Sequence, residues 1–429
     1  MSSLFAKALI LCTLAVSHVQ AKVQSAPTLP RSSRGQCPNK PAGRLEDGQK
    51  TNPLPGLLGI IPDIESDSVL PWTFPPKCPG LQTDNSTGSK LHCIFTSAEF
   101  RNGHGLSLIT STTTASNLVG LDAFDDRPTP QAAERRAAWG PAYEVVEIGG
   151  KGKGLVASRT IRRGEIILVD FPAILIATSF LADTKPHHRR RLIKQAISQL
   201  PEETRRRFYA LSRGPEKYEV DAIVGVNSNS VMLGDNDLHV GVFTEAARIN
   251  HGCQPNAAYR FSQRRLTMEI VAYHTIEAGE EITMSYVPIT TPASERRKHL
   301  QENWGFACQC SLCHADELAL GESENNRRRM TELRDSILDA RKNGYFQDAI
   351  NIAGDWLQFS EWERVPPLLP EYHETLAELY FLNGDLVNAT RYGRMSLDGW
   401  VKFGSVDDDS LERARGFLRF LTSRTEKAT

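Results

Sequence analysis

Three cysteines stand close enough in the sequence to bind one metal ion together: Cys308, Cys310 and Cys313. Thiolate is a soft ligand, and Zn2+ takes four thiolate or imidazole ligands in a tetrahedron. The three cysteines therefore leave one place for a residue from elsewhere in the chain. Three residues could supply that ligand: Cys253, which lies 55 residues before Cys308, and the histidines His299 and His314.

Polar segments that could bind a small ligand or orient a reacting group occur at three other places. Residues 248–256 read RINHGCQPN, residues 276–286 read IEAGEEITMSY, and residues 151–155 read KGKGL. Each has a purely structural explanation when taken singly. Asn-His and Pro-Asn favour turns, Gly-x-Gly favours a tight hairpin, and the second segment fits an edge strand.

The elements that must position these residues are strands in the middle of the chain. From residue 91, short apolar runs alternate with glycine-rich turns. The run 143–148 (YEVVEI) ends at Gly149-Gly150, and 166–176 reads as an apolar strand pair broken at Phe171-Pro172. The pattern lacks the strand–helix alternation of a dinucleotide-binding domain, so it predicts small antiparallel sheets.

Residues 186–212 interrupt this pattern with an amphipathic helical segment. Leu192, Ile193, Ile197 and Leu200 recur at helical spacing. The basic residues around them are Lys185, Arg189, Arg190, Arg191, Lys194, Arg205, Arg206 and Arg207. We expect a helical insert with a basic outer face, which is most simply a solvated surface and could also dock an acidic partner.

The C-terminal region, residues 326–422, reads as helices separated by glycine and proline. A pattern that begins at Asn343-Gly344 returns at Asn383-Gly384, an offset of 40 residues. Small residues at helical spacing in both copies would let paired helices approach closely, as in a TPR-like array with longer units. Packing against the rest of the protein is the simpler interpretation of this region, and peptide binding is the alternative.

The N-terminus has the pattern of a secretory signal peptide over residues 1–21. An apolar stretch, LILCTLAV at 9–16, is followed by small residues suited to cleavage after Ala21. Residues 22–80 are rich in Pro, Gly and Ser and predict an extended, loop-rich segment. Cys37, Cys78 and Cys93 are odd in number, so in an oxidising compartment one pair would bridge and one thiol would remain.

The overall composition is that of a globular protein of two to three domains. The 429 residues include 50 Lys+Arg and 51 Asp+Glu, and 40% are hydrophobic. A net charge of −1 excludes a uniformly basic nucleic-acid binder, and we expect no sequence-specific nucleic-acid binding. No segment beyond the N-terminus has 18 uninterrupted apolar residues, so we expect no membrane span.

Together and in this order, the segments resemble a SET domain followed by its post-SET cysteine tail. Residues 250–256 are similar to the family's NHxCxPN segment, 279–286 to its GEE…Y segment, 151–155 to its early Gly-x-Gly turn, and 308–313 to its zinc-binding tail. The likeness covers about residues 141–314. The layout resembles the SMYD-like proteins and the fungal group named SET domain-containing protein 5, without a MYND-type Cys/His cluster in the insert.

The resemblance implies an α+β fold. It would consist of a SET-domain β-fold of small antiparallel sheets with a pseudoknot, a helical insert, a post-SET zinc site and an all-α TPR-like C-terminal region. The expected divisions are a signal peptide (1–21), an N-terminal region with three cysteines (22–140), the SET domain (141–290) with its insert (about 178–240), the post-SET segment (291–320) and the helical region (321–429).

SET proteins transfer a methyl group from S-adenosylmethionine to a lysine amine, and the resemblance assigns roles on that basis. Tyr286 would be the catalytic residue. The cofactor-binding residues would be Lys151, Gly152, Lys153, Gly154, Asn227, Asn250, His251 and Phe306, with Phe306 stacked on the adenine. The Zn2+ ligands would be Cys253, Cys308, Cys310 and Cys313. Gly252 stands where the family often has Ser, and Trp304 where some relatives have a second channel tyrosine.

The leading interpretation is therefore a monomeric protein-lysine N-methyltransferase whose substrate is a lysine of a histone or another protein. The alternative from another class is a SET scaffold with little activity that serves as an interaction module. A third is a secreted protein whose cysteines pair as disulfides. The predicted signal peptide conflicts with the nuclear or cytoplasmic site expected for lysine methylation, because thiolates stay reduced there, so the sequence leaves the location open.

Overall fold

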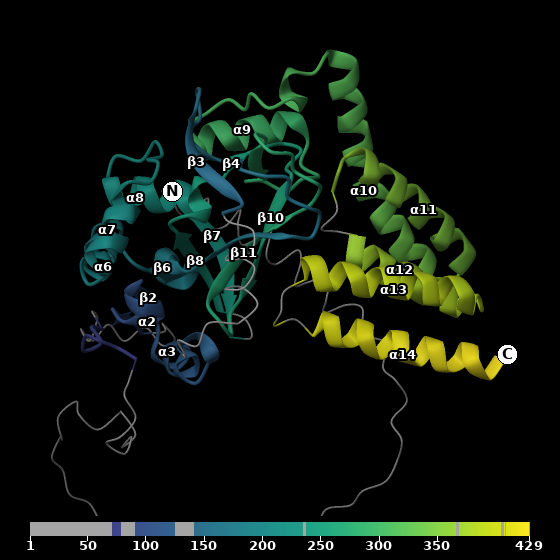
Figure 1. Ribbon diagram of the computed structural model, residues 1–429, viewed down its shortest axis with the longest axis horizontal. Coiled ribbons are helices and arrows are strands. Elements are labelled where there is room, and N and C mark those ends of the chain that lie inside the picture. The colour runs from purple at the N-terminus through teal and green to yellow at the C-terminus, as the bar shows by residue number, and fades with distance from the viewer. Residues whose placement is uncertain are drawn as a thin grey trace, which may run out of the picture. The chain divides into compact units, whose positions relative to one another are not determined.

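The computed structural model of the protein describes residues 71–78, 91–124, 141–234, 237–365, 369–404, 407 and 409–428. The predicted signal peptide and Cys37 lie outside these residues. The fold is α+β, as predicted, with three small sheets and a helical C-terminal region (Figure 1). None of the helices in the described part of the chain combines the length and apolarity needed to cross a bilayer.

The largest sheet has five strands in the order β1-β2-β6-β8-β7. Their bounds are β1 His92–Ser97, β2 Leu106–Ser111, β6 Pro172–Ala177, β8 Asp237–Phe243 and β7 Ser228–Leu233. Every residue of the central strand β6 (PAILIA) is buried, which is the pattern of a strand covered on both faces. Short helices α2 (Phe100–Gly103) and α3 (Thr112–Val119) flank β2 in the sequence.

Helices of the insert cover one face of this sheet. They are α5 (Thr178–Asp183), α6 (Pro186–Ser198), α7 (Glu202–Tyr209) and α8 (Glu219–Asn227). Leu192, Ile193 and Ile197, the residues that predicted an amphipathic helix, join Ile174 and Ile176 of β6 in one buried cluster. The helices end at Asn227, and the remainder of the segment assigned to a helical insert forms strands β7 and β8.

The basic residues of the insert are less exposed than their sequence pattern predicts. Arg189 is buried and donates from Nη1 to the Leu181 carbonyl oxygen at 2.7 Å. Arg190 pairs with Asp221 at 3.2 Å, and its guanidinium lies 3.8 Å from the centroid of the Tyr218 ring. These two residues therefore stabilise the insert and do not contribute to a basic outer face.

Two smaller sheets form the part of the fold that carries the sequence motifs. The first has the order β10-β11-β5, with β10 Ala257–Ser262, β11 Thr267–Ala272 and β5 Ile166–Asp170. The second has the order β3-β4-β12-β9, with β3 Tyr143–Ile148, β4 Gly152–Ala157, β12 Glu281–Met284 and β9 Asn250–His251. The strand predicted over 143–148 is confirmed as β3.

The small sheets are mostly antiparallel, as predicted, and two strand pairs are parallel. β2 pairs in parallel with β6, and β9 pairs in parallel with β12. The strand pair predicted over 166–176 is confirmed as β5 and β6, which belong to different sheets on either side of Phe171. The chain thus leaves one sheet and enters the next at the Phe171-Pro172 break.

The C-terminal helices pack one against the next, α10 on α11 through to α13 on α14 (Figure 1). They follow α9 (Ala293–Trp304), with α10 Glu317–Lys342, α11 Phe346–Trp362, α12 Leu369–Leu382, α13 Leu386–Phe403 and α14 Ser410–Ala428. The 40-residue echo falls on the turns before α11 and α13, where Gly344 and Gly384 have φ of +79° and +83°. Glycine adopts this left-handed conformation without strain. The likeness to a TPR array remains a prediction.

Cys78 and Cys93 form a disulfide. Cys93 is fully buried in β1, so the bond ties the segment 71–78 to the main hydrophobic core. Trp72 of the same segment packs on Phe95, with ring centroids 5.4 Å apart. Of the three N-terminal cysteines, these two are the pair that bridges.

Candidate active site and cysteine cluster

The parallel pairing of β9 with β12 brings two of the sequence motifs side by side. Asn250 lies opposite Thr283, and His251 lies opposite Met284. β12 also pairs with β4, the strand that begins in the Gly-x-Gly turn. Residues from three distant parts of the sequence therefore meet on adjacent strands, and the end of β12 leads directly to Tyr286.

Two glycines are required at this junction because side chains already fill the space beside them. A Cβ on Gly154 would lie 2.5 Å from Ile148 Cδ1 and 2.7 Å from Asn250 Nδ2. A Cβ on Gly252 would lie 2.9 Å from Thr283 Oγ1. The glycine at position 252 is thus matched to its neighbour on β12.

A polar network joins the Gly-x-Gly turn to β9 and β12. Lys151 Nζ lies 2.6 Å from Glu281 Oε2, and Asn250 Nδ2 donates to Glu281 Oε1 at 3.0 Å and to the Lys153 carbonyl oxygen at 3.4 Å. Asn256 extends the network by donating to Glu281 O at 2.9 Å. Sequence reasoning gave Glu281 and Asn256 no role, although both stand inside the quoted motifs.

Tyr286 lies beside this network with its hydroxyl group held in one direction. Its Oη donates a hydrogen bond to the Ile249 carbonyl oxygen at 2.8 Å. Desolvation by the surrounding protein raises the pKa of the phenol above its ordinary value, and the nearby carboxylate of Glu281 adds to the effect. The hydroxyl is therefore protonated at neutral pH.

His251 is buried and uncharged at neutral pH. Burial lowers its pKa to about 4. The backbone N–H of Tyr286 donates to Nδ1 at 3.1 Å, so Nδ1 is the acceptor and Nε2 carries the proton. Nε2 lies 3.4 Å from Cys253 Sγ, and the imidazole therefore links the Tyr286 backbone to the cysteine cluster.

Aromatic rings surround Tyr286 on two sides. The Trp304 ring lies 5.3 Å from the Tyr286 ring, and the Phe306 ring lies 6.4 Å from it, at 83°. Trp304 is fixed by a hydrogen bond from Nε1 to the Val226 carbonyl oxygen at 3.2 Å. Phe306 also lies 6.3 Å from the His251 ring. These residues enter the site because α9 ends at Trp304 and the chain reverses at Gly305.

Asn227, a predicted site residue, has no hydrogen bond to Asn250 or His251 in the described part of the chain. Its side-chain Nδ2 donates to the Ser212 and Ile223 carbonyl oxygens, each at 2.7 Å. It caps the end of α8 in this way. Its place next to Val226, whose carbonyl holds Trp304, still brings it to the edge of the aromatic group.

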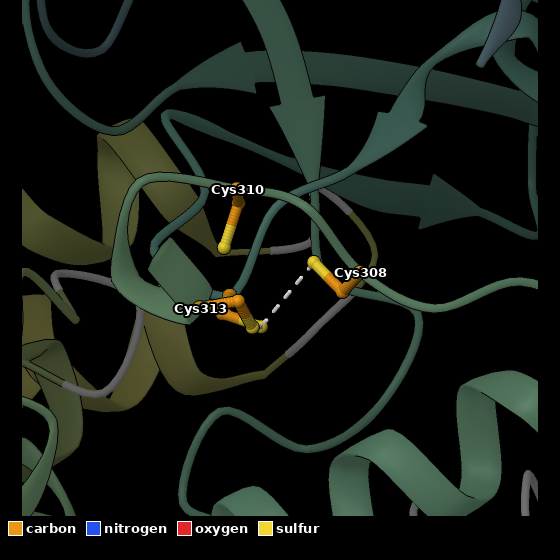
Figure 2. A group of neighbouring side chains, drawn as sticks. Cys308, Cys310 and Cys313 are labelled. Atoms are coloured by element: carbon orange, nitrogen blue, oxygen red, sulfur yellow. Dashed lines mark hydrogen bonds between the residues drawn. The ribbon is translucent and has the colours of Figure 1, made fainter. Parts of the chain in front are cut away.

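The four predicted zinc ligands converge. Their sulfur atoms all lie within 4.8 Å of one another, in a group consisting of Cys253, Cys308, Cys310 and Cys313. Cys253 Sγ is 3.8 Å from Cys308 Sγ and 3.6 Å from Cys313 Sγ. Figure 2 shows Cys308, Cys310 and Cys313 turned toward a common centre. In the described chain, Cys253 thus completes the group, and His299 and His314 do not belong to it.

A group of four thiols at these distances could hold a metal ion. Four thiolates in a tetrahedron are a donor set that Zn2+ prefers for a structural site. A pocket of about 390 Å³ opens beside the group. Its lining includes Lys151, His251, Glu281, Gln309, Cys310 and Arg364, so it connects the polar network with the cysteine tail.

Comparison with known proteins agrees with this arrangement. Residues 152–287 match the SET domain family. The chain is 30% identical over 187 residues to the Schizosaccharomyces pombe protein named Histone-lysine N-methyltransferase set5, covering 44% of this chain and 55% of that protein. It is 23% identical over 212 residues to human Histone-lysine N-methyltransferase SMYD1, covering 41% of this chain and 42% of that protein. The chain therefore spans about half of the length of these relatives.

The matched region begins at the Gly-x-Gly turn and ends one residue after Tyr286. It includes β9 and β12, and the cysteine tail follows it after α9. Residues 152–287 thus match the SET domain family, and the chain is similar to the proteins named set5 and SMYD1 over less than half of its length.

Proposed function

We propose that this protein is an S-adenosylmethionine-dependent protein-lysine N-methyltransferase. The observation that carries the proposal is the Tyr286 hydroxyl, which is protonated, directed by the Ile249 carbonyl and placed beside Asn250-His251 and two aromatic rings. The names of the similar proteins from fission yeast and human support this activity and suggest a histone lysine as the substrate.

The residues present fit the cofactor. The backbone of the turn is open to a ligand at Gly152, where an added Cβ would meet nothing within 4 Å. Lys151–Gly154, Asn250 and His251 would hold its amino-acid and adenosine parts, and Phe306 would offer a ring face to the adenine. When bound, S-adenosylmethionine supplies the methyl group that passes from its sulfonium to the lysine amine. Asn227 would act at the edge of this site.

The chain's own residues would bind and orient the amine. The Tyr286 hydroxyl uses its proton on Ile249, so the lone pairs of Oη are free to accept a hydrogen bond from the amine N–H. Burial among Trp304, Phe306 and Tyr286 disfavours an ammonium, and this lowers the pKa of the substrate lysine toward the neutral, nucleophilic form. Exclusion of water and fixed orientation supply the remaining rate enhancement.

The four cysteines would hold one Zn2+ in a closed structural site. With no open coordination position, the ion would bind no substrate. Its role would be to fix the tail that carries Phe306 against β9, because Cys253 follows β9 and the other three cysteines follow Phe306.

The proposal is tested with the purified full-length protein, S-adenosylmethionine and a panel of histone peptides. We expect calorimetry to show cofactor binding and mass spectrometry to show methylated lysine. Tyr286→Phe should lower turnover by about a hundredfold, because one oriented polar group at a reacting centre contributes about that much. It should leave the cofactor Kd within about twofold. Absence of cofactor binding by the wild type would refute the proposal and leave a SET scaffold that acts as an interaction module.

A further inference from the structure

The longest helix of the C-terminal region, α10, carries a buried arginine, Arg327. Arg327 is 1% exposed, whereas the side chains of its neighbours Arg328 and Arg329 are 66% and 49% exposed. A buried guanidinium persists only where its charge is paired and its donors are satisfied. The hydrogen-bond partners of the Arg327 guanidinium therefore show which parts of the chain this residue connects.

Its charge is neutralised within the C-terminal helices. Arg327 Nε lies 2.8 Å from Oε2 of Glu363, which follows α11 and is 2% exposed. The Glu363 carboxylate also accepts hydrogen bonds from Ser323 Oγ at 2.7 Å and Asn326 Nδ2 at 3.1 Å. The ion pair is thus part of the packing of α10 on α11.

The other two nitrogens of Arg327 donate hydrogen bonds to backbone outside the C-terminal helices, in the SET-like region and the loop after it. Nη2 donates to the carbonyl oxygen of Cys253 at 3.0 Å, and Nη1 donates to the carbonyl oxygen of Ile289 at 2.6 Å. Cys253 belongs to the cysteine group and lies two residues after His251. Ile289 lies three residues after Tyr286. The Arg327 guanidinium therefore binds the backbone close to His251 and the backbone close to Tyr286.

A second contact of α10 holds the segment that leads to Trp304. Glu324 Oε1 lies 3.1 Å from Nη2 of Arg296, which is 1% exposed on α9. The same carboxylate accepts from the backbone N–H of Ala293, the first residue of α9. Arg327 and Glu324 are neighbours on α10, so this helix fixes three parts of the site: β9, the segment after β12, and α9.

We infer that Arg327 is a positioning residue of the site. Helix α10 then holds the backbone of the site in place and does not only pack against it. The inference rests on the proposed function for its effect on turnover, but its effect on the cysteine group is independent of that function. Groups that hold metal ligands from outside the coordination sphere typically change affinity or activity by about ten- to a hundredfold when they are removed.

The test is a charge-balanced double variant, R327M/E363Q, in the full-length protein loaded with Zn2+. Removal of Arg327 alone would leave a buried carboxylate unpaired and destabilise the fold, whereas removal of both charges is often close to neutral. The amide oxygen that E363Q introduces can still accept from Ser323 and Asn326. The matched control is R341M/E378Q, which removes the 2.7 Å ion pair between α10 and α12 without touching the SET domain.

The first measurement is the rate at which iodoacetamide alkylates each cysteine of the group, followed by mass spectrometry. We expect Cys253 to react about tenfold faster in R327M/E363Q than in the wild type, and within about twofold of the wild type in R341M/E378Q. The second is turnover with a methyl-accepting peptide. We expect kcat to fall by about tenfold while the cofactor Kd stays within about twofold.

A third variant, R327K, is used if the melting temperature of R327M/E363Q is far below that of R341M/E378Q. R327K keeps a charge opposite Glu363, but its single nitrogen cannot hold the Ile289 and Cys253 carbonyls together. A folded R327K or R327M/E363Q with the alkylation rates of the control would overturn the inference. A wild type that binds no S-adenosylmethionine would refute the proposed function alone, because the alkylation comparison would still decide the role of Arg327.

Discussion

Replacement of Gly154 by alanine tests the geometry at the centre of the candidate site. The added Cβ would lie 2.7 Å from Asn250 Nδ2, and ordinary contact begins at 3.4 Å, so the amide must withdraw by about 0.7 Å. Asn250 is held by Glu281 Oε1 at 3.0 Å and by the Lys153 carbonyl at 3.4 Å. A shift of that size breaks at least the longer of these two hydrogen bonds.

The expected magnitude follows from the hydrogen bond that breaks, which is the longer one to the Lys153 carbonyl. A hydrogen bond between uncharged groups contributes about 0.5–1.5 kcal/mol, so displacement of Asn250 should weaken cofactor binding by about two- to tenfold. The backbone at Gly154 lies outside the left-handed region, so alanine adds no backbone strain there, and its effect comes from the displacement of Ile148 and Asn250. The assay is calorimetric titration with S-adenosylmethionine beside a thermal melt.

Gly150 provides the matched control because the two glycines differ in what limits them. A Cβ on Gly150 would meet nothing within 4 Å, but its φ of +76° makes alanine cost about 1–2 kcal/mol. We therefore expect Gly150→Ala to lose stability through backbone strain and yet to bind the cofactor as the wild type does. Equal cofactor affinity in Gly154→Ala and the wild type would refute the role given to Asn250.

Three further predictions concern other parts of the molecule. Burial lowers the pKa of His373 to about 4, so the unfolded chain binds a proton that the folded chain resists. The stability that the neutral His373 contributes is complete above about pH 6.5 and is lost as the pH falls toward 4. In urea unfolding, the free energy of unfolding should fall less between pH 7 and pH 5 for His373→Gln than for the wild type, and an equal fall would contradict this. Reduction of the Cys78–Cys93 bond, which closes a separation of 15 residues, should cost about 3 kcal/mol in urea unfolding, and an unchanged midpoint would argue against the bond. Cys308→Ser should lower bound zinc from about one ion per chain toward none by plasma emission spectrometry, and full retention would exclude it as a ligand.

The sequence predicted the members of the site better than the connections between them. The Cys308, Cys310 and Cys313 spacing identified three ligands, but spacing alone left the fourth among Cys253, His299 and His314, and the resemblance to SET proteins assigned it to Cys253. The structure selects Cys253 because β9 pairs with β12 and the chain turns at that point toward the cysteine tail. Strand pairing of this kind depends on residues far apart in the sequence, so the spacing of nearby residues does not predict it.

The same limit applies to the sheets. The break at Phe171-Pro172 correctly marked where a strand ends, but a local pattern does not reveal which sheet the next strand joins. The segment predicted as a helical insert, about 178–240, includes β7 and part of β8 after its four helices. Tertiary pairing with β6 decides their conformation, since β8 lies directly beside that buried strand.

Arg327 had no recognisable signal in the sequence at all. It is the first of three consecutive arginines in a polar helix, and such a run ordinarily indicates a solvated face. Only the register of α10 distinguishes it, because Ser323, Arg327 and Met330 lie on the buried face and Arg328 and Arg329 do not. Local sequence patterns do not predict residues that connect two regions, because neither region alone requires them.

The two kinds of cysteine in the described chain impose different demands on its surroundings. The Cys78–Cys93 bond forms in an oxidising compartment, whereas the group around Cys253 needs free thiolates to bind a metal. Sulfur separations of 3.6 and 3.8 Å within the group are short enough that small movements would allow a disulfide. Bound Zn2+ would occupy the thiolates and remove that reaction, so metal loading before oxidation lets both states exist in one molecule. The disulfide and the predicted signal peptide are then compatible with a four-cysteine zinc site, provided that the group receives its metal while the chain is still reduced.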